Sequence, residues 1–532
     1  MTLLIMSSAY VSNEMRNEFG LVPPSFLPAG SGCLYELQFS ACSLGGPCHI
    51  TLPLGFDVPE IDAMRFKALG VTPLFLPENA SVTATLISAI EAIRPEGTLK
   101  VLFGDTLVDM DEVQHELPDS IAIKMAQSNH HWLYVDPEAM IFSEHSTASS
   151  SNNFVSCGYY SFSDPASLVE IAREASLEEV LGIYNEQHSL TCFEPETWLD
   201  FGHVSLFYQS KKDLLVSRAF NSVTVQDNVL SKFSSDTRKI RAEANWFNSL
   251  PGELVLHCPR FMGETSKSGL AGYSLEYMYL PTLSDLFTLG RLPSRNWSRI
   301  FDGVADFLNL CQRHRPLATM PEGQETFADT FFDELIRTKS NERLNYFLTN
   351  SKIDTKRRFS VNSVEFPALS TVLQHSLEVI PRTKIEDISL WHGDLFFGNI
   401  LYDIRAERIM CLDPRGLIGS DFSIYGDVRY DLAKLAHSIF GKYDSIIANR
   451  YSLISLSEAQ LEFQVGEISH QDKIQEVFEA KILNEFGMSK REALALCSIL
   501  FLSMLPLHGD DQTRQYALLA TALQCYEKWT SL

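Results

Sequence analysis

Apolar positions in the first two hundred residues fall into short runs with alternating strand-like and helix-like spacing. Runs typical of buried strands occur at residues 2–11, 98–105 and 130–136. Residues 82–93 (VTATLISAIEAI) instead place apolar side chains three and four positions apart, as on one face of a helix. Strands that alternate with helices predict a mostly parallel sheet covered by helices on both faces. We therefore expect an α/β, Rossmann-like domain over residues 1–210.

The pattern changes near residue 213. Residues 214–220 (LLVSRAF), 222–234 (SVTVQDNVLSKFS) and 272–280 (GYSLEYMYL) have the composition of antiparallel strands. A helix is predicted between the second and third, over residues 237–250. This order predicts a small, mainly β lobe over about 211–285.

From about residue 293 the chain has mainly helical spacing. The clearest helices are predicted over residues 295–314, 327–350 and 366–380. We expect a helical lobe over about 286–532, which makes residues 211–532 a second, α+β domain. A chain of 532 residues is too long for one hydrophobic core, in keeping with two domains.

Composition and charge narrow the class of protein. The chain is 45% apolar and 21% charged, as in ordinary globular proteins. Its net charge of −24 argues against nucleic acid or an anionic membrane as the main partner. Ten cysteines without a C-x-x-C pair fit a reduced, cytoplasmic location, and homo-oligomerisation is left open. The apolar stretch 493–507 is too short to span a bilayer and is interpreted as a buried helix, so no membrane insertion is expected.

The most informative stretch is LWHGDLFFGNILYD, residues 390–403. It places Asp394 after His-Gly, Asn399 five residues later, and then two short strands whose turn precedes Asp413. Such a hairpin would bring Asn399 close to Asp413. Phosphoryl transfer needs a carboxylate that orients a hydroxyl, and an amide and a second carboxylate as Mg²⁺ ligands. The alternative is a hairpin whose Asp and Asn side chains only cap turns; the ordered set of three favours the chemical interpretation.

The segments HGDLFFGN, CLDPRG and YGDVRYDLAKL together resemble the aminoglycoside phosphotransferase and choline kinase family, which has a protein kinase-like fold. The resemblance implies that Asp394 is the catalytic base and that Asn399 and Asp413 are magnesium ligands. It also implies structural roles for Asp427 and Asp431, although Asp431 could equally be an ordinary helix cap.

The ATP side of a kinase fold lies upstream. Lys232 is predicted on a strand and Glu243 on the next helix, the pairing with which kinase folds hold the α and β phosphates. Lys239 is the rival lysine, but it falls within the helical stretch. The loop over the phosphates would be 217–223 (SRAFNSV), which has no glycine.

A hinge facing adenine is expected within 275–287 (LEYMYLPTLSDLF). Backbone groups near Glu276 and Met278 are the candidates for adenine contacts.

Two aspartates of the first domain also suggest metal chemistry. Asp105 follows a strand, in LFGDTLVD, and Asp200 lies in a W-x-D-x-G context. With CGYYSFSD at 157–164, these segments resemble sugar-phosphate nucleotidyltransferases. The resemblance implies that the two aspartates hold the Mg²⁺ that bridges a nucleotide and a sugar phosphate. His203 is interpreted as a packed loop histidine.

The first domain departs from that family at its phosphate-binding segments. Residues 7–20 replace the usual Gly-rich loop, and Pro24 stands where a lysine is expected. Arg16 is the first candidate for the missing positive charge and Lys100 a weaker one. The domain is therefore either an active transferase or a degenerate module that only binds a nucleotide or sugar.

These patterns predict a cytoplasmic bifunctional enzyme. The second domain would use ATP and Mg²⁺ to phosphorylate a small hydroxyl substrate, a sugar, polyol or amino alcohol. The first would couple the phosphate to a nucleotide from a second NTP, giving a precursor for surface or capsular polysaccharide. The alternative is a single-activity kinase whose first domain is a binding or regulatory module.

Overall fold

The computed structural model describes residues 1–42, 45–78, 80–126, 130–144, 153–171, 175–218, 223–316, 324–419 and 421–532. The chain divides into two compact units, Met1–Leu214 and Leu215–Leu532, so the division falls inside one helix, α8 (Val204–Arg218). The sequence placed the boundary at 210/211.

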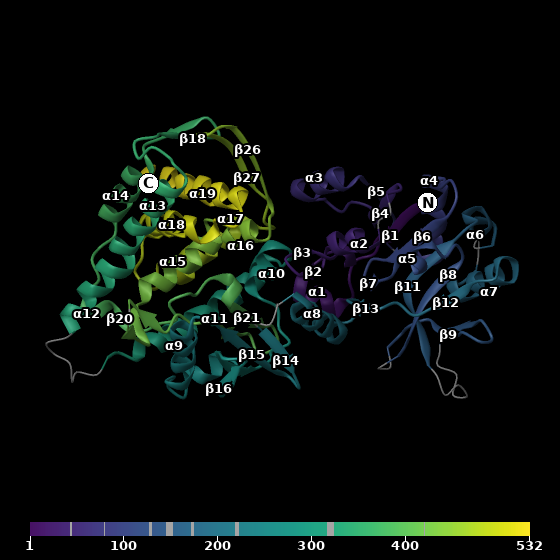
Figure 1. Cartoon of the computed structure of the whole chain (residues 1–532), viewed down its shortest axis with the longest axis horizontal. Helices are drawn as coiled ribbons and strands as arrows, with labels where there is room; N and C mark the ends of the chain where they lie inside the picture. The colour runs from purple at the N-terminus through teal and green to yellow at the C-terminus, as the bar shows by residue number, and fades with distance from the viewer. Residues whose placement is uncertain are drawn as a thin grey trace. The chain divides into compact units, whose positions relative to one another are not determined.

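Unit 1 is built on a nine-stranded mixed sheet (Figure 1). Its centre is parallel: β1 pairs with β4 and β6, and β4 pairs with β5. β11 runs antiparallel to β6, β8 and β9, which makes the other half of the sheet mixed. The strands are β1 (Thr2–Met6), β4 (Cys48–Pro53), β5 (Val71–Leu76), β6 (Leu99–Phe103), β8 (Ser120–Met125), β9 (Tyr134–Asp136), β10 (Ile141–Ser143), β11 (Phe154–Phe162) and β12 (Thr191–Phe193).

Helices cover this sheet, and two small strand pairs flank it. The pairs are β2 (Pro28–Ala29) with β3 (Gly32–Cys33), and β7 (Thr106–Asp109) with β13 (Thr197–Asp200). The helices are α1 (Asn13–Phe19), α2 (Leu34–Cys42), α3 (Glu60–Leu69), α4 (Val82–Ile93), α5 (Glu112–Glu116), α6 (Pro165–Ile171), α7 (Leu177–His188) and α8. The predicted α/β class is confirmed.

Helix α4 shows how sequence spacing becomes packing. Ser81 caps its first turn by accepting a hydrogen bond from the Ala84 amide. Its buried side chains include Leu86 and Ile90, one turn apart, which join Leu4 of β1 in one core cluster. Burial of each such side chain contributes about 1.5–3 kcal/mol.

Unit 2 begins with a four-stranded antiparallel sheet in the order β14-β15-β17-β16. Helix α9 (Thr237–Asn248) packs against it. The strands are β14 (Val223–Gln226), β15 (Val229–Ser234), β16 (Phe261–Lys267) and β17 (Leu270–Glu276). The sheet and α9 form the predicted β lobe, although two of the strands expected in it are not observed as predicted.

Two strand predictions here are wrong. Residues 214–218 end helix α8 rather than starting a strand; the apolar positions Val204, Phe207 and Tyr208 precede them at helical spacing. Residues 222–234 hold a hairpin rather than one strand, because Asp227 and Asn228 adopt positive φ and turn the chain back.

The rest of unit 2 is mainly helical, as predicted. Its helices are α10 (Leu283–Thr288), α11 (Ser294–Arg313), α12 (Gln324–Thr330), α13 (Lys339–Asn350), α14 (Leu369–Val379), α15 (Val428–Ile439), α16 (Tyr443–Ile447), α17 (Gln471–Phe478), α18 (Lys490–Met504) and α19 (Gln512–Thr530). A π-helical segment, Phe331–Thr338, joins α12 to α13.

A second sheet, β19-β18-β27-β26, is inserted among these helices and was not predicted. Its strands are β18 (Phe359–Val361), β19 (Val364–Phe366), β26 (Tyr451–Ser457) and β27 (Gln460–Val465). Short strand pairs complete the unit: β20 (Ile388–Leu390) with β25 (Tyr425–Asp427), β21 (Ile400–Asp403) with β22 (Arg408–Cys411), and β23 (Leu417–Ile418) with β24 (Asp421–Phe422).

One helical stretch in the described part of the chain, Lys490–His508, is long and apolar enough to cross a membrane. The prediction that it is too short is therefore wrong. The prediction that it is a buried helix holds, since 72% of its apolar window is buried inside the protein. α18 packs against α14, α15 and α19 (Figure 1).

Candidate active sites

The loop that carries Asp394 lies between β20 and β21 and is held in place by a buried carboxylate. Asp431, within α15, accepts hydrogen bonds from the amides of His392 (2.8 Å) and Gly393 (2.7 Å). Burial raises the pKa of Asp431 to about 7. The residue that caps α15 is Asp427, so the interpretation of Asp431 as a helix cap is wrong. Asp431 instead stabilises the loop through these two hydrogen bonds.

The Asp394 carboxylate is partly exposed and faces basic groups. The Lys434 ammonium lies 2.9 Å from its Oδ1. Desolvation opposes ionisation of Asp394, but Lys434 and Arg415 outweigh it and hold the pKa at about 2. An ionised carboxylate can accept a hydrogen bond from a hydroxyl and so orient it.

The predicted hairpin is present and brings the motif residues together. Ile400 pairs with Cys411, and the Leu412 amide donates to the Asn399 carbonyl (2.8 Å). The Asn399 side-chain amide donates to the Asp394 carbonyl (3.0 Å). Asp413 follows Leu412 directly and has a backbone φ of +52°.

Lys232 contacts two carboxylates at once. Its ammonium lies 2.8 Å from Glu243 Oε2 and 2.9 Å from Asp413 Oδ1. Burial alone would lower the pKa of Lys232, but Asp413 and Glu243 raise it. The hydroxyl of Tyr273 lies within hydrogen-bond distance of the same two carboxylates, at 3.0 and 3.3 Å. Lys239 is exposed in the first turn of α9 and takes no part.

Gly416 allows the loop that carries Asp413 to pack closely against α9. Its φ is +66°, and a Cβ there would collide with the carbonyl of Ala242, next to Glu243. Only glycine fits this contact. The loop that carries Asp413 therefore packs directly on the helix that carries Glu243.

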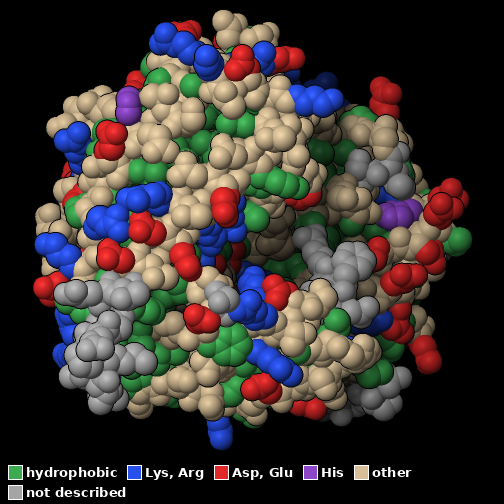
Figure 2. Space-filling view, turned by 60° about the vertical axis from the view of Figure 1, so that its left-hand side comes forward, with side chains coloured by type: hydrophobic (Ala, Val, Ile, Leu, Met, Phe, Trp, Pro, Cys, Tyr) green, Lys and Arg blue, Asp and Glu red, His purple; other side chains and the backbone are tan. Residues whose placement is uncertain are grey.

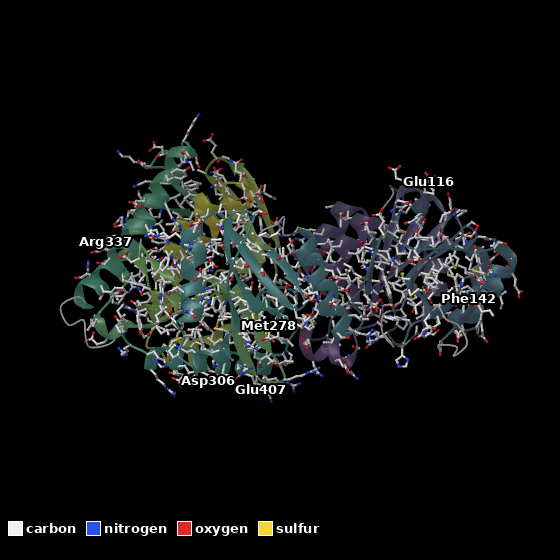
Figure 3. The ribbon with its side chains drawn as sticks, turned by 60° about the horizontal axis from the view of Figure 1, so that its bottom comes forward. Glu116, Phe142, Met278, Asp306, Arg337 and Glu407 are labelled. Atoms are coloured by element: carbon white, nitrogen blue, oxygen red, sulfur yellow. The ribbon has the colours of Figure 1, made fainter. Side chains whose placement is uncertain are left out.

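The expected hinge follows β17. Glu276 is exposed at the end of the strand, and its amide donates to the Arg260 carbonyl (2.9 Å). The Tyr277 amide donates to the Asn228 carbonyl (2.7 Å), and Met278 comes next (Figure 3). Most of the expected phosphate loop, 217–223, lies outside the described residues.

In unit 1 the two predicted aspartates converge although they are 95 positions apart. Asp200 is in register with Thr106, the residue after Asp105, and the Phe201 amide donates to the Asp105 carbonyl (2.7 Å). A Cβ on Gly202 would lie 2.5 Å from Asp105 Oδ2 and 3.5 Å from Asp200 Oδ1. Both carboxylates therefore border the same small space.

The two carboxylates are electrostatically coupled. Burial, and then the charge of Asp200, raise the pKa of Asp105 to about 6. Asp200 accepts a hydrogen bond from the Trp132 indole (2.9 Å) and raises the pKa of His203, whose Nδ1 lies 4.0 Å from it. A cation between the carboxylates would relieve their repulsion, and hard oxygen ligands suit Mg²⁺.

The residues considered as sources of positive charge for phosphate binding in unit 1 differ in their exposure to solvent. Lys100 is buried in β6 and donates to the His115 carbonyl, so it cannot reach a phosphate. Arg16 is exposed on α1. Pro24 begins a short turn whose Phe26 is buried against Tyr35 and Phe56.

No group of three or more His, Cys, Asp or Glu side chains suited to a metal ion occurs in the residues that the structure describes. The candidate metal sites are thus pairs of side chains: Asn399 with Asp413, and Asp105 with Asp200. Each supplies oxygen ligands and leaves further positions for phosphate oxygens and water, the way Mg²⁺ is usually held at nucleotides.

Residues 219–456 match the family described as phosphotransferase enzyme family. The C-terminal unit therefore contains a phosphotransferase-family domain. The family match includes all the residues of this unit in which we predicted chemistry, from Lys232 to Asp413. No curated protein matches the chain.

Several solved structures are similar to one or other unit. The inositol-1-phosphate CTP transferase from T. maritima is 12% identical and covers 40% of this chain and 96% of its own, with a TM-score of 0.29. An aminoglycoside-3'-phosphotransferase of type VIII is 14% identical and covers 52% of this chain and 84% of its own, with a TM-score of 0.32. Spectinomycin phosphotransferase is 12% identical and covers 57% and 86%, with a TM-score of 0.29. At these values the assignment of the phosphotransferase domain rests on the family match and the topology.

Several residues of the phosphotransferase site were not predicted from the sequence. Arg415 and Lys434 lie inside the quoted motifs CLDPRG and YGDVRYDLAKL, so their positions were a usable signal. Tyr273 gave no signal beyond its place on a strand.

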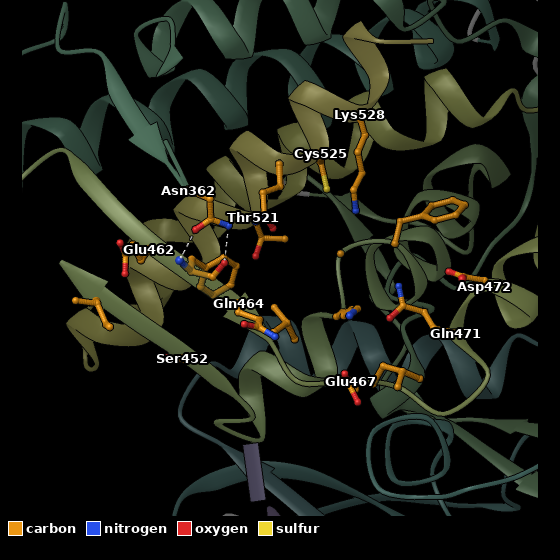
Figure 4. A pocket seen from close by; sticks show the side chains of 18 of the residues that line it. Asn362, Ser452, Glu462, Gln464, Glu467, Gln471, Asp472, Thr521, Cys525 and Lys528 are labelled. Carbon is orange, nitrogen blue, oxygen red and sulfur yellow. Dashed lines mark hydrogen bonds between the residues drawn. The ribbon is translucent and has the colours of Figure 1, made fainter. Parts of the chain in front are cut away.

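A cavity of about 1220 Å³ lies elsewhere in unit 2 (Figure 4). It is lined by β26, β27 and α19, and by residues that include Lys442, Glu467 and Lys528. Asn362 at its edge is bonded to the backbone of Phe463. None of the predicted site residues lines it.

Proposed function

We propose that the chain is a cytoplasmic bifunctional enzyme that phosphorylates a small hydroxyl substrate with ATP and then couples that phosphate to a nucleotide. Two observations support this proposal most directly. Lys232 contacts both Glu243 and Asp413. The side-chain amide of Asn399, at the start of the hairpin, donates to the Asp394 carbonyl. This combination is what phosphoryl transfer requires of a protein.

In the proposed reaction Lys232, positioned by Glu243, binds phosphate oxygens of ATP. Asp394 accepts the hydrogen bond of the substrate hydroxyl and directs its oxygen at the γ-phosphorus. Asn399 and Asp413 would hold Mg²⁺, which neutralises phosphate charge when bound. Lys434 keeps Asp394 ionised at neutral pH.

For unit 1 we propose nucleotidyl transfer to the phosphorylated product. Support comes from the convergence of Asp105 and Asp200 on the space beside Gly202. These two residues would hold the Mg²⁺ there, and the NTP would supply the nucleotide. An NDP-sugar or a CDP-linked alcohol for surface or capsular polysaccharide would be the product.

A second function for unit 1 is favoured by one observation. The segment in which a catalytic lysine is expected buries Phe26 in an aromatic cluster instead. On that ground unit 1 would bind a nucleotide or sugar without turning it over, and the chain would be a kinase with a binding module.

The deciding experiment incubates the protein with Mg²⁺, ATP, and CTP, UTP or GTP, together with a panel of sugars, polyols and amino alcohols. Mass spectrometry then identifies compounds that gain a phosphoryl or a nucleotidyl group. Gain of phosphate alone supports the binding-module alternative. Gain of neither, with no consumption of ATP, would refute the proposed function.

A further inference from the structure

Both oxygens of the Asp200 carboxylate in unit 1 accept a hydrogen bond. The Gly202 amide donates to Oδ1 (2.8 Å), and the indole of Trp132 donates to Oδ2 (2.9 Å). A carboxylate oxygen has two lone pairs, so each oxygen keeps one for a further ligand. A donor on each oxygen also restricts rotation of the carboxylate. The two hydrogen bonds therefore set the direction in which the remaining lone pairs point.

Trp132 reaches this carboxylate from a distant part of the chain. It lies 68 positions before Asp200 and shortly before β9. Its ring contacts Trp198 edge to face, with centroids 5.4 Å apart, and His130, with centroids 5.3 Å apart. The ring of His130 lies in turn 4.5 Å from that of His203. These ring contacts hold the indole in place beside Asp200.

A second tryptophan supports the strand on the other side of the site. Trp198 lies two residues before Asp200 on β13, and its indole donates to the Thr106 hydroxyl (2.9 Å). That hydroxyl donates to the Cys157 carbonyl (2.9 Å). Thr106 directly follows Asp105. One indole is thus hydrogen-bonded to Asp200 and the other to the neighbour of Asp105.

A purely structural role for Trp132 would be the simpler interpretation, since a buried indole N–H normally finds a hydrogen-bond partner. The buried Trp246 shows that case, because its indole donates to the Trp391 carbonyl. Trp132 differs in two respects. It is only half-buried, so water could satisfy its N–H. Its partner is a carboxylate whose other oxygen borders the space shared with Asp105.

We propose that Trp132 is a positioning residue that orients the Asp200 carboxylate for a divalent metal ion, with Trp198 supporting its ring. This inference rests on the nucleotidyl transfer proposed for unit 1 and adds the residues that hold one metal ligand in place. A carboxylate that is oriented beforehand loses less conformational freedom when the metal binds. Replacement of such a hydrogen-bond partner typically weakens metal binding by about tenfold to a hundredfold.

The test measures binding of Mn²⁺, which prefers the same oxygen ligands as Mg²⁺, by electron paramagnetic resonance without nucleotide. All proteins are full chains that carry Asp413→Ala, so that the other candidate metal site does not contribute. Acidic side chains are scattered over the face shown in Figure 2, so Mn²⁺ will also bind weakly elsewhere. Asp200→Asn gives the level of that binding outside the site.

Trp132→Phe keeps a ring against Trp198 but removes the N–H donor. We expect it to raise the Kd of Mn²⁺ by about tenfold or more and to lower the Tm by only a few degrees. Trp198→Phe acts on Asp200 only indirectly and should raise the Kd by a smaller factor. His131→Gln is the matched control, because His131 is the exposed neighbour of Trp132. Its Kd should stay within about twofold of that of the parent protein.

An unchanged Kd in a folded Trp132→Phe protein would overturn the inference, whether or not the Tm falls, because the indole would then only stabilise the fold. If Trp132→Phe does not fold, equal Kd values for Trp198→Phe and His131→Gln would overturn it. In both cases the loss of binding in Asp200→Asn would leave the metal pair standing. Equal Mn²⁺ binding by the parent protein and by Asp200→Asn would instead refute the metal pair, and with it the function proposed for unit 1.

Discussion

Lys232 lies between Glu243 and Asp413, at 2.8 and 2.9 Å, and so joins helix α9 to the loop of the candidate metal site. Both carboxylates compete for one ammonium. Binding of MgATP would separate them: Glu243 would keep the lysine, while Asp413 would turn to the metal.

Lys232→Ala should therefore reduce kcat/KM for phosphoryl transfer by about a hundredfold or more, because phosphate positioning is lost. Conversion of a supplied phosphorylated substrate by unit 1 should persist in the same variant. Lys239→Ala is the control, since this exposed lysine should be dispensable. Loss of both activities in a folded Lys232→Ala protein would show that the two units are coupled.

Asp394→Asn should abolish phosphoryl transfer and leave the Kd of ATP within a few-fold, because the amide cannot accept the hydroxyl proton. Initial rates and calorimetry measure the two effects. Asp302→Asn, an exposed surface change in the same unit, should behave as wild type. Near wild-type turnover by Asp394→Asn would exclude its catalytic role.

Asp413→Ala should weaken ATP binding in the presence of Mg²⁺ and have little effect without it. Calorimetry with Mg²⁺ or with EDTA compares the two conditions. An unchanged Mg²⁺ dependence would remove Asp413 from the metal site.

Alanine at Asp105 or Asp200 should leave nucleotidyl transfer undetectable while the kinase reaction continues. Either change also removes the like-charge repulsion that raises the pKa of Asp105, so neither should lower the Tm much. Asp109→Ala, on the exposed side of β7, is the control. Persistence of nucleotidyl transfer would show that this pair does not hold the catalytic metal.

Lys339 makes the stability of the chain depend on pH in a defined direction. Burial, and then the charges of Arg415, Arg343 and Lys434, lower its pKa from 10.5 to about 6 on folding, so the unfolded chain binds more protons between those values. The free energy by which this lysine destabilises the folded chain is fully present at and below pH 6. It disappears as the pH approaches 10.5, changing by no more than about 1.4 kcal/mol per pH unit. Lys339→Gln should therefore have a higher Tm than wild type at pH 6–7, with the difference shrinking by pH 9. Equal Tm values across that range would contradict the burial and repulsion described for Lys339.

The phosphotransferase site was predictable where chemistry and sequence spacing coincide. Asp394, Asn399 and Asp413 lie within twenty positions of one another, and a hairpin of that length has few ways to fold. Lys232 and Glu243 were found because a strand and the next helix pack locally. Lys339 could not be predicted, since only the tertiary packing of α13 brings it near enough to Asp394 for the charge of that carboxylate to act on its pKa.

The fold was predictable to a similar extent. Helix α4 was placed at its observed bounds because its apolar spacing is regular and its N-cap is a serine. The strand predicted at 214–220 was wrong because a short apolar run cannot distinguish the last turn of a helix from a strand. The β18, β19, β26 and β27 sheet was missed since its parallel β18–β27 pairing joins segments about a hundred residues apart.

The tight contact of Gly416 with α9 bears on how the enzyme would be controlled. In many kinases an outward swing of the corresponding helix turns activity off, and a signal brings it back. Here the loop that carries Asp413 packs so closely on the helix that an outward swing would have to move both together, and Lys232 pairs with Glu243 of the same helix. We expect an enzyme that is always switched on, with flux set by the supply of its acceptor, as suits a metabolic step better than a signalling one.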